Sequence, residues 1–211
     1  MRKRYVLFLL LLSFFSQVKA FEAEISKITE KIKERMYKGN SYHKGCPVPL
    51  QKLRYIQLDH YNLQHQSVKG ELIVHEDLAE EVVEIFHMLY KKHFPIAKMR
   101  LVSDFNGSDI LSMQHNNTSA FNCRYIAGTT KFSNHSYGRA IDINPLFNPC
   151  IQNAEVSPPN ALPYADRRQQ MEGMLHKDDF IIKLFRKYGW KWGGEWRSLK
   201  DYQHFEKRRE R

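Results

Sequence analysis

Residues 133–143 read SNHSYGRAIDI and combine an expected turn with an expected strand. Side chains alternate between the two faces of a strand, so the isoleucines that flank Asp142 point into a core and Asp142 points the other way. Gly138 lets the chain turn sharply before the strand, because glycine adopts positive φ freely. His135 can therefore fold back beside Asp142. The stretch predicts a core strand that presents a histidine and a carboxylate together.

These two side chains offer an imidazole nitrogen and a carboxylate oxygen, which bind zinc at about 2.0–2.2 Å. A third ligand must come from elsewhere, and His204 in DYQHFE is the best candidate because it lies in a second short strand pattern. Two histidines and one aspartate leave the fourth zinc position open, which is typical of a catalytic site. Zinc lowers the pKa of a bound water from about 15.7 to about 7. Asp201, three residues before His204, could take the proton from that water and pass it to a leaving amine.

The spacing of these residues also allows a simpler interpretation. Both H-x6-D and D-x-x-H are short patterns that occur often by chance, so His135 and Asp142 could be ordinary polar groups beside a strand. The chain has ten histidines. The other eight are expected to be surface or core residues: His43, His60, His65, His75, His87, His93, His115 and His176.

The N-terminus has the pattern of an export signal. MRKR is basic, an apolar run of eleven residues follows at 5–15, and small residues lead to Ala20. A membrane-spanning helix needs about 20 apolar residues, so the run is too short to cross a bilayer. We expect a cleaved signal peptide over 1–20, no stable membrane insertion after cleavage, and a periplasmic or secreted protein. An uncleaved anchor is the alternative.

Charge and length narrow the class of protein. The 211-residue chain carries a formal charge of +10, and loss of the four basic residues at 1–20 lowers it to +6. A basic exported protein suits an anionic partner such as a cell wall, a membrane surface or nucleic acid. The basic tail at 207–211 could equally be a solvated surface. The mature length is suited to one domain.

Apolar periodicity outside residues 133–143 predicts a mixed fold. We expect helices at 22–38, at 78–93 with Asp77 as its cap, and at 178–189; we expect strands at 53–61, 70–76, 98–104, 138–144 and 201–206. The stretches 104–132 and 148–172 are expected to be long loops, and 190–196 (WKWGGEW) an aromatic turn. Two or three helices with short strands indicate an α+β fold. The metal site would lie on a small antiparallel sheet.

Two motifs resemble those of a known family. SNHSYGRAID resembles the S-x-H-x-x-G-x-A-x-D motif of the zinc D-alanyl-D-alanine carboxypeptidase family (VanY-like), which also includes L-alanyl-D-glutamate endopeptidases. DYQHFE resembles the second motif of this family, in which an acidic residue precedes the last histidine by three positions. The resemblance spans about residues 40–206. It implies a zinc peptidase domain there, after an N-terminal helical segment at 21–39.

The resemblance also implies partners and residue roles. His135, Asp142 and His204 would bind Zn²⁺, and Asp201 would be the general base. Arg124 in FNCR would be a catalytic and substrate-binding residue that stabilises an oxyanion or holds a substrate carboxylate, with Arg139 as its competitor. Ser133 would support His135 or touch the substrate. The substrates would be peptidoglycan stem peptides, bound by a monomer that does not act on nucleic acid.

Other functions remain open from the residues alone. Cys123 could be the nucleophile of a cysteine cell-wall endopeptidase, with His135 as its base. The chain could also be a non-catalytic, zinc-stabilised cell-wall-binding module, or a basic metal-dependent nuclease. Cys46, Cys123 and Cys150 allow one disulfide and leave one thiol, and their spacing does not show which two pair.

Overall fold

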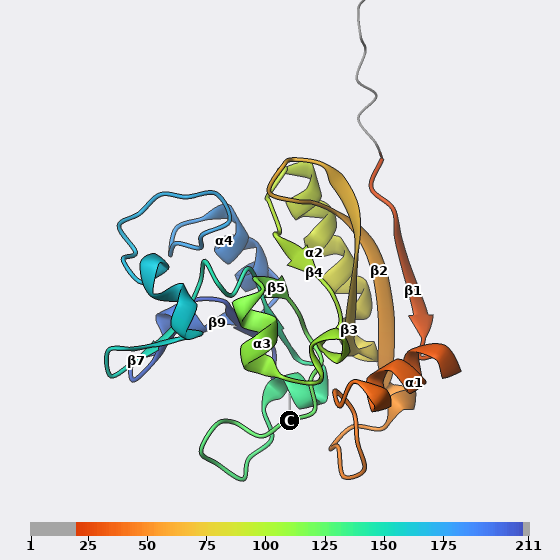
Figure 1. The fold of residues 1–211 in the computed structure, drawn as a ribbon. Helices are drawn as coiled ribbons and strands as arrows, with labels where there is room; N and C mark the ends of the chain where they lie inside the picture. Colours follow the sequence, from red (N-terminus) through yellow and green to blue (C-terminus); the bar gives the residue numbers. More distant parts are fainter. Residues whose placement is uncertain (1–19, 209–211) are drawn as a thin grey trace, which may run out of the picture.

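The computed structural model describes residues 20–208 (Figure 1). Residues 1–19 of the expected signal peptide and residues 209–211 of the basic tail lie outside this range. The expected α+β fold is confirmed. Within the described range, no helix is both long enough and apolar enough to cross a membrane.

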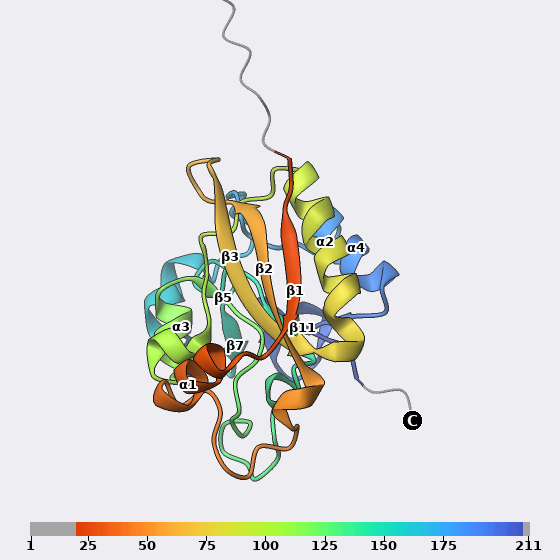
Figure 2. The same cartoon turned by 90° about the vertical axis from the view of Figure 1, so that its right-hand side faces the viewer.

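The longest strands form an antiparallel sheet in the order β1–β2–β3 (Figure 2). Strands β2 (Leu53–Tyr61) and β3 (Ser67–His75) pair along their whole length. Both strands were predicted, although β3 begins three residues before the expected 70–76. Strand β1 (Ala23–Lys27) pairs with β2. The expected helix at 22–38 is therefore wrong in its first half, and only α1 (Glu30–Lys38) is helical. The Thr29 side chain accepts a hydrogen bond from the Ile32 backbone N–H and begins the helix there, which leaves the preceding residues free to pair with β2.

Two amphipathic helices lie side by side against the core (Figure 2). Helix α2 (Ala79–Lys91) buries the predicted apolar face along its length, and α4 (Phe180–Lys187) lies within the expected range. Asp77 does not cap α2, which corrects the prediction. It lies in a 3₁₀ turn (Glu76–Leu78) before the helix, and its carboxylate accepts a 2.6 Å hydrogen bond from Arg139 instead.

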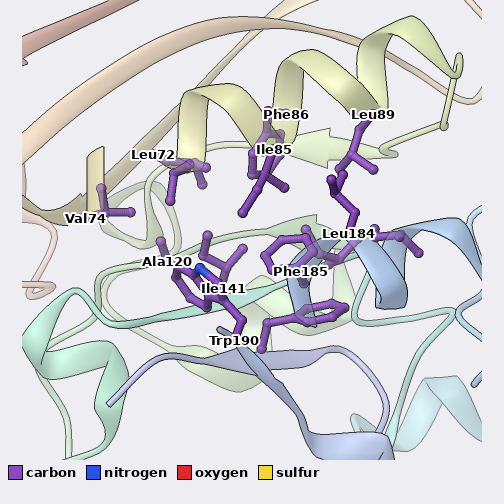
Figure 3. Packing of buried hydrophobic residues seen from close by; sticks show 14 of the residues in the cluster. Leu72, Val74, Ile85, Phe86, Leu89, Ala120, Ile141, Leu184, Phe185 and Trp190 are labelled. Atoms are coloured by element: carbon purple, nitrogen blue, oxygen red, sulfur yellow. The ribbon is translucent and has the colours of Figure 1, made fainter. Parts of the chain in front are cut away.

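The main core lies between the long sheet, the two helices and a small sheet (Figure 3). Strands β6 (Ala140–Asp142), β11 (His204–Glu206) and β9 (Lys191–Trp192) form this small antiparallel sheet in that order. Its buried members include Ile141 and Phe205, and Phe185 of α4 stacks on Phe205 with ring centroids 4.0 Å apart. Burial of these apolar side chains holds the small sheet at a defined place on the molecule.

Both stretches expected to be long loops contain short elements. Residues 104–132 hold α3 (Asp109–Gln114), capped by the Ser108 side chain, and β5 (Asn117–Thr118), which pairs with β4 (Lys98–Met99). The strand expected at 98–104 is therefore shorter than predicted and runs into a 3₁₀ turn (Val102–Phe105). Residues 148–172 hold β7 (Cys150–Gln152) and β8 (Glu155–Ser157), which form a third sheet with β10 (Lys200–Asp201). Short polar elements of this kind lack the long apolar periodicity that reveals a helix or strand.

Candidate metal centre

Antiparallel pairing of β6 with β11 places Asp142 directly opposite His204. His135 comes from the 3₁₀ turn (Asn134–Tyr137) that precedes β6. Gly138 then turns the chain with φ at 66°, as expected from the sequence, and a Cβ on Gly138 would lie 2.5 Å from the backbone nitrogen of His75. Glycine is therefore needed at this turn both for its backbone conformation and for the space around it.

The structure brings the three expected ligands together. His135 Nε2 lies 3.2 Å from His204 Nδ1 and 3.2 Å from Asp142 Oδ2, while His204 Nδ1 lies 2.9 Å from Asp142 Oδ1. The three residues are only 2%, 4% and 7% exposed. A tetrahedral zinc ion with bonds of about 2.0–2.2 Å holds its ligand atoms about 3.3–3.6 Å apart. The two imidazole nitrogens and the Asp142 carboxylate, which meets each histidine through a different oxygen, thus lie close to the spacing that three ligands of one zinc ion require.

The remaining ring nitrogens of both histidines face oxygen atoms. His135 Nδ1 lies 2.5 Å from the carbonyl oxygen of Ala120, and His204 Nε2 lies 3.6 Å from Glu206 Oε2. Glu206 also accepts hydrogen bonds from Asn134 Nδ2 and Arg208 Nε. Such outer partners orient a histidine so that its other nitrogen faces a metal. Glu206 was not expected from the sequence, although its position two residues after His204 on the same strand is a signal that could have revealed it.

The centre gathers three carboxylates, those of Asp142, Asp201 and Glu206, around two imidazoles. Burial would raise the pKa of Asp142, but the imidazoles of His135 and His204 outweigh it and hold that pKa well below its usual range. Burial, aided by Asp142, raises the pKa of Asp201 to about 6. The Oδ1 atom of Asp201 is buried and has no hydrogen-bond partner within residues 20–208. A buried, unpaired carboxylate oxygen is costly, and a nearby divalent cation would compensate for it.

Asp201 comes from β10, where it lies opposite Cys150 of β7. The neighbouring Gly193 explains how this strand approaches His204 so closely. A Cβ on Gly193 would lie 2.5 Å from the Asp201 carbonyl oxygen and 3.3 Å from His204 Cβ. Gly193, expected only to help form a turn, is also required because there is no room for a side chain.

A cavity of about 490 Å³ joins the expected site residues. Asp142, His204 and Asp201 line it, and Arg124 and Ser133 belong to the same lining. Trp196 forms part of its wall and packs against the imidazole of His204, with ring centroids 5.2 Å apart. The cavity therefore brings together two of the expected metal ligands, the Asp201 carboxylate and the Arg124 guanidinium.

Arg124 and its competitor Arg139 point to different places. The Arg124 guanidinium lines the cavity and pairs with Asp109 at 2.7 Å, whereas Arg139 donates to Asp77 outside the cavity. Ser133 Oγ accepts a 3.3 Å hydrogen bond from the His135 backbone N–H. Asp109 was not expected as part of this region, because the sequence did not reveal α3.

Cys123 cannot act as a nucleophile in this structure, because it forms a disulfide with Cys46. The cysteine endopeptidase prediction is therefore wrong. The same bond engages both sulfurs of a second group that could otherwise bind a metal, His43 with Cys46 and Cys123. Cys150 is the free thiol among the three cysteines, and burial raises its pKa to about 12.

Residues 127–207 match a protein-family model described as D-alanyl-D-alanine carboxypeptidase. The family predicted from the two motifs is confirmed over this region. The match supports a peptidase, and it contains the three expected ligands and Asp201 but not Arg124. Neither a curated protein nor a solved structure gave a significant match.

Proposed function

We propose that this chain is an exported, zinc-dependent peptidase that hydrolyses peptide bonds in the stem peptides of peptidoglycan. One observation carries the proposal most directly. Three buried side chains, His135, Asp142 and His204, converge with ligand atoms of each pair within 3.2 Å, and a carboxylate with an unpaired oxygen lines the adjoining cavity. The family match supplies the reaction class.

The residues have distinct proposed roles. His135, Asp142 and His204 hold the zinc ion, which supplies a Lewis acid and lowers the pKa of a water molecule. Asp201 takes a proton at its carboxylate and passes it to the leaving amine. Its raised pKa of about 6 keeps it close to the range in which a group can both accept and release a proton near neutral pH.

Arg124 and Ser133 have proposed roles in binding. The Arg124 guanidinium stabilises negative charge that develops on the substrate carbonyl oxygen, because charge-assisted donors are strongest in an enclosed site. Ser133 stabilises the turn that carries His135, because its Oγ accepts a hydrogen bond from the His135 backbone N–H. Both residues line the cavity beside the proposed ligands.

Several features support export and a wall substrate. A disulfide joins Cys46 to Cys123, and disulfides persist mainly in oxidising compartments outside the cytosol. The charge of +6 expected after signal cleavage suits an anionic wall. The cleaved bond is either the terminal D-alanyl-D-alanine bond named by the family description or a bond within the stem.

The deciding experiment is incubation of the purified chain with defined muropeptides, followed by mass spectrometry. We expect cleavage that a chelator abolishes and added zinc restores. The non-catalytic alternative predicts binding to purified sacculi without release of peptide or D-alanine. Plasmid DNA in a parallel incubation should stay intact, and its digestion would instead support the nuclease alternative.

A further inference from the structure

The guanidinium of Arg124 already has a carboxylate partner inside the cavity. Its Nη2 lies 2.7 Å from Oδ2 of Asp109, and both side chains are 28% exposed. Both residues line the cavity that holds the candidate metal centre. The positive charge that would attract a substrate carboxylate is therefore neutralised by the protein itself.

Both partners of this ion pair are fixed by backbone contacts. Asp109 lies in the first turn of α3, which the Ser108 side chain caps. The Arg124 backbone N–H donates to Ser136 Oγ at 2.9 Å, and the preceding residue is tied to Cys46 by the disulfide. Because neither segment depends on bound ligand for these contacts, the pair is preorganised rather than an incidental surface contact.

Other cations of the cavity are poorly placed to replace Arg124. Arg208 donates to Glu206 at 3.1 Å and its side chain is 72% exposed. Lys131 is exposed on the hairpin that follows Arg124. A solvated lysine holds a carboxylate weakly, because water screens the charge.

The cavity lining also continues past Arg124. It includes Ile126, Ala127 and Lys131 of the hairpin closed by the hydrogen bond from the Ile126 N–H to the Lys131 carbonyl oxygen. Ile126 is 47% exposed and offers apolar surface to a longer ligand. A site built only for a terminal residue would need no such extension.

We propose that Asp109 is a specificity-determining residue that makes the site favour peptides whose chain continues beyond the scissile bond over peptides that end in a free carboxylate there. This inference rests on the proposed peptidase function. A terminal carboxylate would meet Arg124 only by competing with Asp109, and the two like charges would repel. An amide or a continuing peptide has no such charge and can use the remaining donors of the guanidinium.

The test uses two stem peptides that are identical except for the group after the scissile bond. One ends in a free carboxylate on the residue that follows this bond, and the other carries an amide there. For the wild-type chain we expect kcat/KM for the amide to exceed that for the acid. Asp109→Asn should raise the acid-to-amide ratio by about tenfold or more, because it frees a charge-assisted hydrogen bond.

Two variants control for effects on folding and on general charge. Asp166→Asn makes the same change at an exposed carboxylate that pairs with Arg168 at 2.7 Å outside the cavity, and the ratio should not move. Asp109→Glu keeps the negative charge and should keep the wild-type preference. Circular dichroism and zinc content confirm that the variants remain folded.

Each outcome separates the two proposals. If Asp109→Asn leaves the acid-to-amide ratio of kcat/KM unchanged from the wild type, the role of Asp109 is wrong while the peptidase proposal stands. If neither peptide is cleaved, the peptidase proposal fails. In that case calorimetry of the same two peptides still measures whether the acid or the amide binds more tightly. The same ratio of the two dissociation constants in wild type and Asp109→Asn would overturn the inference.

Discussion

Two polar clusters of this protein use similar residue types and differ in how completely their charges are matched. The ion-pair cluster lies between α1, the long sheet and the 3₁₀ turn after β4, and comprises Arg35, Tyr55, Glu71, Arg100 and Asp104. The candidate metal centre comprises His135, Asp142, Asp201, His204 and Glu206.

Every carboxylate oxygen of the ion-pair cluster accepts a contact from a cation or a hydroxyl. Arg35 alone reaches both oxygens of Glu71 and both oxygens of Asp104. In the candidate metal centre, by contrast, three carboxylates surround two histidines, and Asp201 Oδ1 has no partner within the described residues. The first cluster is complete as a protein structure. The second leaves this oxygen unpaired, which is why we propose a metal there.

The largest expected effect comes from removal of a proposed ligand. His204→Ala should lose zinc and reduce hydrolysis by about 10³-fold or more, because the metal contributes several kcal/mol to the reaction. Zinc per chain and turnover of a muropeptide measure the two effects. His115→Ala, at an exposed histidine after α3, is the matched control and should retain both. Normal zinc content in His204→Ala would show that the two clusters do not differ as described.

Asp201→Asn should keep zinc and lose turnover by about 10²–10⁴-fold, the usual contribution of a general base. The variant retains the shape of the side chain but cannot take a proton. Zinc content and kcat, measured on the same sample, distinguish a base from a ligand. Turnover at the wild-type rate would remove Asp201 from the mechanism.

Glu206→Gln should weaken zinc binding by about 10–100-fold, the usual effect of changing a partner that orients a ligand. Competition with a chelator of known affinity measures the change. Glu195→Gln is a suitable control, since Glu195 pairs with Arg186 at 2.9 Å away from the centre. Equal zinc affinity in Glu206→Gln and wild type would mean that the 3.6 Å contact to His204 does not orient the ring.

The smallest effect is expected in the ion-pair cluster. Arg35→Met should lower the free energy of unfolding by about 1–3 kcal/mol, because it leaves partly buried carboxylates without their main donor. Zinc content of the folded variant should stay unchanged. Loss of zinc in this variant would mean that the two clusters are coupled, which their separate contacts do not suggest.

The pH dependence of stability offers a further test of the ion-pair cluster. Burial alone would raise the pKa of Glu71, but hydrogen bonds from Arg35 and Tyr55 outweigh it and lower the pKa. Stability from this group is therefore present above the unfolded pKa of about 4.3 and is lost as the pH falls through the lower folded pKa. The free energy of unfolding in urea should be clearly higher for wild type than for Arg35→Met at pH 7, and the two values should converge near pH 3.

Sequence patterns predicted the parts of the fold with long apolar periodicity. Strands β2 and β3 and the apolar face of α2 match the prediction because each buries a regular row of side chains. The strand β1 and the helix α3 were missed. Strand β1 is short and mostly exposed, and it is a strand because β2 offers an unpaired edge.

The candidate site likewise contains residues that the sequence predicted and residues that it did not. His135 and Asp142 were predictable as neighbours because a glycine turn and a strand connect them within eight residues. Their meeting with His204 depends on the pairing of β6 with β11, across 62 residues of chain. Glu206 and Asp109 were missed because their roles come from partners that are distant in sequence or lie in an unpredicted helix.

The sequence by itself identified which residues are candidates to bind a metal, where the longer core strands run, and which family motifs the chain carries. These properties depend on residue type and local spacing. Only the tertiary structure decided which cysteines pair, that Asp201 has a buried oxygen without a partner, and that Asp109 neutralises Arg124. These properties depend on strand register and packing between distant segments, and the physical reason is that charge and burial belong to the space around a side chain rather than to its neighbours in the chain.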